Sequence, residues 1–307
     1  MDIGFGKSQR ELVNNHTPII LDGKKVANEI ADDLKRRCQI LKDKGCYPKL
    51  IVFTNTDDAS KVYVRNKIKR CEEIGIDAIT CPISKFEDFE VAAQKYDFNE
   101  IPYILQEPSN LTKFQNTVFV DQWYQTDVDG FSASSLGKLF KNEEKNGFTG
   151  MKACTPKGII TLLDYYNIPI EGQKVAILGR SNIVGRPMAA MMLNRDATVS
   201  ICHTKTQQMT LDEEIYSADI IVSAVGKVGM LSGYTSLFYE RKFPRKVLID
   251  VGMNRDENGK LCGDICKEAI EHCYAYTPVP GGVGPMTVIS LCENVIEFYE
   301  NGKDAYL

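Results

Sequence analysis

The sequence has little of what several large classes of protein require. None of its apolar stretches approaches the about 18 residues of a membrane-spanning helix. Its ten cysteines include no Cys-x-x-Cys pair, and its three histidines lie far apart along the chain. Metal centres need clustered ligands, so we expect no metal site. No apolar secretion signal opens the sequence, and the polar segment 1–15 is read as a poorly ordered leader. We therefore expect free thiols in a reducing cytoplasm.

An excess of positive charge is also lacking. Lys and Arg number 37 against 41 Asp and Glu, so the net charge is -4. Nucleic-acid binding calls for a basic face. We therefore expect no nucleic-acid partner, and no membrane partner either. The 307 residues, 43% of them hydrophobic and 25% charged, are sufficient for two globular domains.

Short apolar segments at regular spacing predict a parallel sheet in the second half. Nearly all-apolar strands are typical of a sheet that is covered on both faces. A helix over Met188–Asn194 completes a strand–helix–strand unit, which favours a Rossmann-type, doubly wound α/β domain over residues 154–284. The expected strands are Lys174–Leu178, Thr198–Cys202, Ile220–Ala224 and Val247–Val251.

The first half alternates helical and extended patterns. The segment Phe140–Lys152 is polar and is read as a junction, and Gly75 is expected to cap a helix. The last helix, Thr287–Tyr299, follows a loop with three prolines and three glycines, and is expected to return to the first domain. Residues 1–153 and 285–307 thus form the predicted first α/β domain. Its other elements are helices Val26–Lys44 and Ser60–Ile74, and strands Pro48–Phe53, Ile101–Leu105 and Thr117–Val120.

A glycine-rich turn lies directly after the first strand of the second domain. Gly179 and Gly185 flank Ser181, and the turn opens a helix. In this context the amides at a helix N-terminus hold a pyrophosphate. The turn is not a strict Gly-x-Gly-x-x-Gly motif, because Ser181 stands at the second glycine and the last glycine comes one residue late. A plain tight turn between strand and helix is the alternative.

The residues after the second strand indicate which nucleotide binds. NAD-preferring sites usually carry an acidic residue there for the ribose hydroxyls. This chain has His203-Thr-Lys-Thr206 instead, and Arg180 stands beside the first glycine. Cations and hydroxyls suit a 2′-phosphate, so NADP is favoured over NAD. The alternative is that Arg180 and Lys205 are solvated surface charges.

Tyr63 and Lys67 form a pair on a predicted helix. Their spacing of four places both side chains on one face. Burial lowers the pKa of a lysine, which suits it to proton transfer. The alternative is an exposed pair. Short-chain dehydrogenases have the same spacing, but their glycine-rich turn precedes the pair, whereas here it follows.

A series of motifs spans nearly the whole chain. They are Tyr63-Val-Arg-Asn-Lys67, Asp127-Val-Asp-Gly-Phe131, Cys154-Thr-Pro-Lys-Gly158, Gly179–Pro187, Cys202–Thr206, Ala218–Gly226, Asp250-Val-Gly252 and Thr277–Thr287. In these motifs and their order the sequence resembles the bifunctional methylenetetrahydrofolate dehydrogenase/methenyltetrahydrofolate cyclohydrolase family. The resemblance implies oxidation of 5,10-methylenetetrahydrofolate by NADP, then hydrolysis to 10-formyltetrahydrofolate. It also implies a cytoplasmic homodimer of one-carbon metabolism.

The resemblance implies roles for particular residues. Lys67 is the expected general acid/base of hydrolysis, Gln106 bonds it, and Tyr63 stacks on the folate. Asp129 accepts hydrogen bonds from the pterin. A glycine-rich loop lets backbone approach the folate closely, and the residues implied there are Pro278, Gly281 and Gly282. The implied nucleotide site comprises Gly179, Arg180, Ser181, Ile183, Thr204, Ala224, Val225 and Gly226.

The chain departs from the family around Gln106. It reads Leu105-Gln106-Glu-Pro108 where the family usually has Gln-Leu-Pro-Leu-Pro, and Tyr124-Gln-Thr126 replaces Pro-x-Lys. A dehydrogenase with little or no cyclohydrolase activity is therefore one alternative. A non-catalytic folate- or nucleotide-binding protein is another, although such a protein has no need of a base at Lys67.

Overall fold

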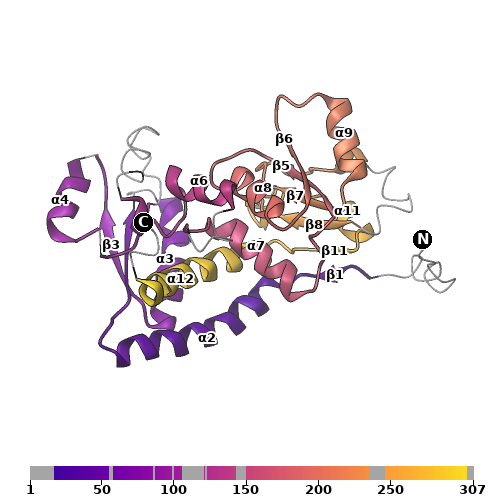
Figure 1. Ribbon diagram of the computed structural model, residues 1–307. Helices are drawn as coiled ribbons and strands as arrows, with labels where there is room; N and C mark the ends of the chain where they lie inside the picture. The colour runs from indigo at the N-terminus through magenta and orange to yellow at the C-terminus, as the bar shows by residue number, and fades with distance from the viewer. Residues whose placement is uncertain are drawn as a thin grey trace. The chain divides into compact units, whose positions relative to one another are not determined.

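The computed structural model describes residues 17–302, apart from residues 55–57, 86, 99, 106–120, 122, 143–149 and 235–245. The side chains of residues 58–63 and 105 also lie outside the described part. The chain divides into two compact units (Figure 1), and each is described by itself. Unit 1 comprises Met1–Gly23 and Leu162–Gly284, and unit 2 comprises Lys24–Thr161 and Pro285–Leu307.

Unit 1 contains a parallel sheet with the strand order β1-β11-β8-β7-β5-β6. Strands β7 and β8 are buried at every residue, which explains their nearly uniform apolar composition. The doubly wound sheet predicted from the sequence is confirmed. The strands are β1 (Ile19–Ile20), β5 (Lys174–Leu178), β6 (Thr198–Cys202), β7 (Ile220–Ser223), β8 (Val247–Asp250) and β11 (Ala275–Tyr276).

The order of these strands creates a switch point at β5. Strand β6 lies on one side of β5 and β7 on the other, so the connections diverge at the carboxyl end of β5, where doubly wound sheets bind their ligands. Gly179 follows β5 at this point. The remaining elements of unit 1 are α8 (Gly185–Leu193), α9 (Gln208–Ser217), η3 (Ser232–Tyr234), α11 (Lys267–His272) and the antiparallel pair β9 (Asn254–Arg255) and β10 (Leu261–Cys262).

Unit 2 is built on a second parallel sheet, with the order β3-β2-β4. An aromatic cluster packs on it, in which Phe53 contacts Phe89, Phe98 and Tyr103 edge-on at ring-centroid distances of 5.1, 5.6 and 6.0 Å. The elements are β2 (Lys49–Thr54), β3 (Asp77–Pro82), β4 (Tyr103–Leu105), α2 (Gly23–Asp43), α3 (Asp58–Ile74), α4 (Glu87–Lys95), η1 (Tyr124–Thr126), α6 (Ala133–Lys141), α7 (Cys154–Tyr165) and α12 (Val283–Asn301).

Several elements differ from the sequence-based expectation. Helix α12 begins at Val283 instead of Thr287, because a proline at the third helical position, Pro285, needs no N–H partner in the first turn. Helix α6 extends to Lys141, into the expected junction. Strand β3 and helix α4 were not predicted, since β3 is only partly buried and has no apolar run. The predicted leader and the strand Thr117–Val120 lie outside the described residues.

The compact units differ from the predicted domain boundaries at two places. Ile19 pairs with Ala275 across β1 and β11, so residues 17–23 lie with unit 1 instead of the first domain. The division then falls between Thr161 and Leu162, inside α7, and not at residue 153. In unit 2, Lys157 in the first half of α7 forms ion pairs with Glu293 and Glu297 of α12.

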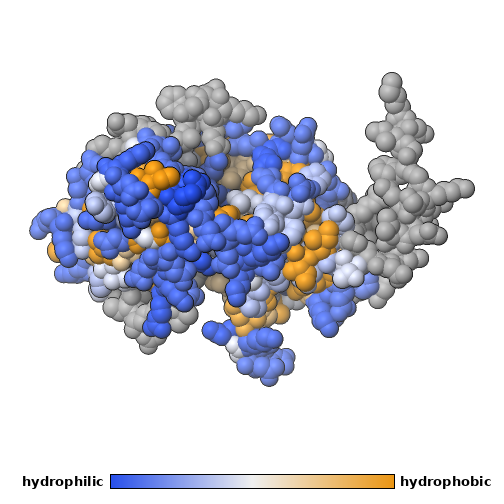
Figure 2. Space-filling view, turned by 90° about the horizontal axis from the view of Figure 1, so that it is seen from below, coloured by the Kyte–Doolittle hydropathy of each residue, from blue (hydrophilic) through white to orange (hydrophobic). Residues whose placement is uncertain are grey.

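The coloured part of the face in Figure 2 is mostly polar. Hydrophobic residues form separate patches on it. Scattered apolar residues of this kind are normal on a globular protein. Within the described ranges, no helix is long and apolar enough to cross a membrane.

Candidate functional site

Helix α3 carries a lysine on its buried face. Val64, Lys67, Cys71 and Ile74 are spaced three or four residues apart, and all are at most 6% exposed. The helix ends at Ile74 and is followed by Gly75, whose φ of +101° suits a residue without a side chain. A buried ammonium group is costly unless it has polar partners. Lys67 is thus a buried lysine on the otherwise apolar face of α3.

Two aspartates lie near Lys67. Asp127 and Asp129 are 1% and 5% exposed, and the charges of both act with that of Lys67 on the Cys154 thiol. Burial raises the pKa of Cys154, Asp129 raises it further, and Lys67 opposes the rise. The thiol hydrogen-bonds the carbonyl of Val128 at 3.4 Å. The charged groups that act on this thiol in unit 2 are thus two lysines, Lys67 and Lys157, and two aspartates, Asp127 and Asp129.

The loop that carries the aspartates is held tightly. Asp127 is bridged to Tyr103 of β4, and its Oδ2 accepts hydrogen bonds from Phe131 N at 2.7 Å and Ser132 N at 2.8 Å. Gly130 has a φ of +73°, and a Cβ there would lie 2.7 Å from Ala153 N. Because the backbone approaches so closely, only glycine fits at position 130.

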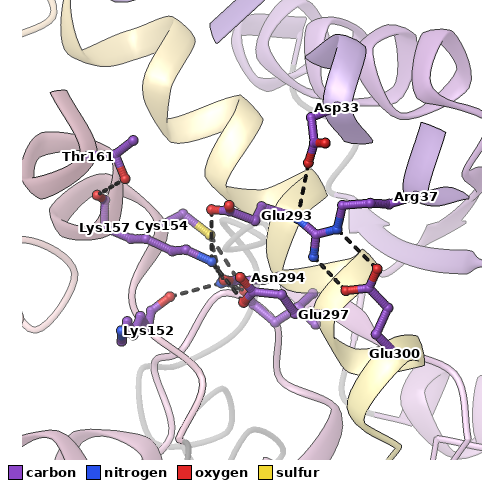
Figure 3. A network of polar contacts seen from close by, with 11 residues as sticks. Asp33, Arg37, Lys152, Cys154, Lys157, Thr161, Glu293, Asn294, Glu297 and Glu300 are labelled. Carbon is purple, nitrogen blue, oxygen red and sulfur yellow. Dashed lines mark hydrogen bonds and ion pairs between the residues drawn. The ribbon is translucent and has the colours of Figure 1, made fainter. Parts of the chain in front are cut away.

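Asn294 of α12 also holds this loop through hydrogen bonds. Its Nδ2 donates to the carbonyls of Val128 at 2.8 Å and Lys152 at 2.9 Å, and its Oδ1 accepts from Lys157 at 2.9 Å. Figure 3 shows Lys157 extending from α7 toward Asn294 and the α12 glutamates Glu293 and Glu297. The aspartate loop, the start of α7 and α12 therefore form one connected polar network.

Burial raises the pKa of Asp127 to about 7, and the neighbouring Asp129 adds to the rise, against the opposing effect of three backbone N–H donors. The folded protein binds this proton more tightly than the unfolded chain, whose aspartates titrate near about 3.9. The contribution of Asp127 to stability is therefore fully present below about pH 4 and is lost as the pH rises toward 7.

Asp127→Asn is expected to stabilise the protein more at pH 8 than at pH 5. An asparagine Oδ1 can accept the same two N–H bonds without a buried charge. The difference between variant and wild type in the free energy of unfolding should grow by a few kcal/mol from pH 5 to pH 8, because each unit of pKa shift is worth about 1.4 kcal/mol. Urea midpoints at both pH values measure it. Asp88→Asn is the control, since Asp88 also accepts two backbone N–H bonds but is exposed and its pKa is lowered. If the stability difference between Asp127→Asn and wild type is the same at both pH values, the pKa of Asp127 is not raised and the prediction is wrong.

The glycine-rich turn of unit 1 is sterically demanding. Gly179 has a φ of +119°, and a Cβ there would lie 2.5 Å from the carbonyl oxygen of Ala224. A Cβ at Gly185 would lie 2.7 Å from the carbonyl carbon of Gly179. Ser181 Oγ accepts from Val184 N at 3.1 Å and Gly185 N at 3.4 Å, so it holds the turn at the start of α8 and keeps its own proton to donate. The turn suits a pyrophosphate at the N-terminus of α8.

The other residues expected at the nucleotide lie at the same edge of the sheet. Arg180 and Ile183 follow β5, Thr204 follows β6, and all three are exposed. Ala224, Val225 and Gly226 follow β7. The carboxyl ends of parallel strands meet at one edge, so the structure brings these residues together with Gly179 and Ser181.

The residues expected at the folate are divided between the units. Pro278, Gly281 and Gly282 follow β11 in unit 1, where Gly282 N donates to Pro278 O at 2.7 Å. Lys67 and Asp129 lie together in unit 2. Tyr63 lies on α3 four residues before Lys67, but its side chain is outside the described part, as is Gln106.

Sequence reasoning missed four residues that organise these sites. Asp127 lies in the same motif as Asp129, and Cys154 in the same motif as Lys157. Their positions in these motifs were the signal that could have identified them. Asn294 and Asp264 lie in no such motif. Their side chains form hydrogen bonds with residues that lie 10 to 166 positions away in the sequence.

The fold and these residues define a class of α/β protein in which a Rossmann-type nucleotide-binding unit is joined to a second unit with a buried lysine. Residues 21–100 match the catalytic domain of the tetrahydrofolate dehydrogenase/cyclohydrolase family, and residues 153–303 match its NAD(P)-binding domain. The chain belongs to this family, so the resemblance read from its motifs is confirmed.

Individual relatives match over most of their length. Bifunctional protein FolD of Methanoculleus marisnigri is 42% identical over 90% of this chain and 94% of its own. The crystal structure of the bifunctional FolD enzyme from Campylobacter jejuni is 36% identical, with a TM-score of 0.80 over 92% of this chain and 98% of that one. The Trypanosoma brucei enzyme, solved with NADP cofactor and an inhibitor, is 28% identical, with a TM-score of 0.79 over 94% and 99%.

Proposed function

We propose that this protein oxidises 5,10-methylenetetrahydrofolate to the 5,10-methenyl form with NADP, and then hydrolyses that product to 10-formyltetrahydrofolate. The observation that carries the proposal is Lys67, which is buried on the apolar face of α3 and lies near two buried aspartates, in a chain of this family. A protein that only binds ligands has no need of a buried base there.

In the hydrolysis step, Lys67 Nζ accepts a proton from the water that adds to the methenyl carbon. It returns a proton to N5 as the bond from that carbon to N5 breaks, the hydroxyl proton of the adduct passes to solvent, and the formyl group stays on N10. Asp129 binds the pterin through its carboxylate, which accepts from the amino group and a ring nitrogen. Asp127, Asn294 and Gly130 hold the loop so that Asp129 keeps this orientation. Tyr63 stacks on the folate and Gln106 bonds Lys67.

In the oxidation step, bound NADP supplies the hydride acceptor. The turn from Gly179 to Gly185 and the Ser181 hydroxyl hold the pyrophosphate. Arg180 and Thr204 favour the 2′-phosphate of NADP over the plain ribose of NAD. The product cation is delocalised over two nitrogens, so this step needs positioning more than a strong base.

We assign folate binding to unit 2, together with Pro278, Gly281 and Gly282, and nucleotide binding to unit 1. We also propose that the protein works as a cytoplasmic homodimer that pairs through unit 1. These assignments follow the family resemblance. Size-exclusion chromatography with light scattering tests the dimer.

A two-wavelength absorbance assay tests the function. Purified protein receives methylenetetrahydrofolate with NADP, and separately with NAD. We expect reduced NADP to accumulate with only a transient methenyl intermediate. Accumulation of the methenyl product would leave a dehydrogenase alone. A folded protein that reduces neither nucleotide would refute the proposal.

A further inference from the structure

A second buried carboxylate organises unit 1. Asp264, between β10 and α11, is fully buried. Its Oδ2 accepts from Ser223 Oγ at 3.1 Å, Val225 N at 2.9 Å and Gly226 N at 3.3 Å. Its Oδ1 accepts from Lys227 N at 3.0 Å and Asn254 Nδ2 at 2.8 Å. One side chain therefore gathers donors from the end of β7, the loop after it, and β9.

The donors from residues 225–227 are successive backbone amides that point at one place. Such a concave set of amides, called a nest, is a common anion-binding device. Here the carboxylate of Asp264 fills the nest. Its negative charge and volume exclude a phosphate group from these amides.

The filled nest also sets the shape of the neighbouring turn. Ala224 immediately precedes the nest, and its N–H donates to Leu178 O at 2.9 Å. A Cβ at Gly179 would lie 2.5 Å from the carbonyl oxygen of Ala224, which shows how closely the two loops approach. A shift of residues 224–227 would therefore change the wall against which the glycine-rich turn packs.

Asp264 is itself fixed by Asp250 at the end of β8. Asp250 Oδ1 accepts from Asp264 N at 2.9 Å and Gly252 N at 2.9 Å, and its Oδ2 accepts from Ile265 N at 2.9 Å. A side chain at Gly252 would overlap the Asp264 carboxylate. The glycine of the Asp250-Val-Gly252 motif is thus required by this carboxylate.

We propose that Asp264 is a positioning residue for the nucleotide, which fills the nest of residues 225–227 and holds that loop against the turn at Gly179. The inference rests on the proposed function. The loop then presents carbonyl oxygens and the Val225 side chain to the cofactor, and the amides of Val225 and Gly226 take no part in binding it.

Asp264→Asn tests this role with almost no change in volume. An amide has one acceptor oxygen, so its NH₂ group must face either the Oδ1 donors or the Oδ2 donors. In both orientations at least two hydrogen bonds are lost. The loop of residues 225–227 should become more mobile, while the parallel sheet of unit 1 keeps its structure.

We expect the KM for NADP to rise at least about tenfold in Asp264→Asn, with kcat at saturating NADP within about threefold of wild type. Hydrogen exchange of the amides of residues 225–227 should accelerate. The matched control is Asp219→Asn. Asp219 accepts from Lys174 N at 2.9 Å, but it precedes β7 and so lies at the opposite edge of the same sheet. This control should leave the KM and the exchange unchanged.

An unchanged KM in folded Asp264→Asn would overturn the proposal, as would an equal rise in Asp219→Asn. Direct measurement of the NADP dissociation constant separates this inference from the proposed function. A wild-type protein that binds NADP without oxidising the folate refutes the function, and the dissociation constants of the variants still decide the role of Asp264. A wild-type protein that binds no NADP overturns both.

Discussion

Replacing Lys67 by methionine is expected to slow the hydrolysis of methenyltetrahydrofolate by about 10²- to 10⁴-fold, while reduction of NADP stays measurable. Methionine keeps the length and apolar packing of the buried side chain but has no proton to transfer. The hydride step depends on alignment and not on this base. Absorbance assays of methenyltetrahydrofolate hydrolysis and of NADP reduction, made on the same sample, measure both effects.

The control for this substitution lies on the same helix. Lys69 has a side chain that is 73% exposed and pairs only loosely with Glu73, at 3.9 Å. Lys69→Met should leave both rates close to those of the wild type. Equal loss of both activities in a folded Lys67→Met protein would contradict the role of Lys67 as the general acid/base of hydrolysis.

Gly185→Ala is expected to weaken NADP binding by about tenfold to 100-fold, since forcing extra atoms into a packed site typically costs about 1–3 kcal/mol. The added Cβ would lie 2.7 Å from the carbonyl carbon of Gly179 and 2.8 Å from Arg180 Cα, so the turn must open. The hydrogen bonds from Val184 N and Gly185 N to Ser181 would be disturbed with it. Fluorescence titration with NADP measures the loss.

Gly233→Ala is the matched control, because a Cβ there meets nothing within 4 Å and the site is in the same unit. Its NADP affinity should equal that of the wild type. The hydrolysis rate reports whether unit 2 is intact in both variants, since that step takes no nucleotide. Undiminished NADP binding by Gly185→Ala would remove the glycine-rich turn from the nucleotide site.

Local patterns in the sequence were sufficient for much of the fold. Strand β5 has the predicted bounds, because a strand buried on both faces must be apolar at nearly every residue. Strand β6 also has the predicted bounds, although it is an edge strand in which only Cys202 is buried. The glycines of the turn after β5 were recognisable because their spacing and place are a local property of the chain. Strand β3 was missed because its partly buried residues show no such run.

The sequence by itself determined the family, the doubly wound sheet, and the lysine on the inner face of α3, since these depend on short motifs and periodicity. Only the tertiary structure decided which residues support the sites. Asn294 reaches Val128 across 166 residues, and Asp264 reaches Ser223 across 41. No local pattern encodes such pairs, because a hydrogen bond depends on the positions that the folded backbone gives its two atoms. The same holds for the pKa of Asp127, which is raised because folding buries its carboxyl group and brings Asp129 near it.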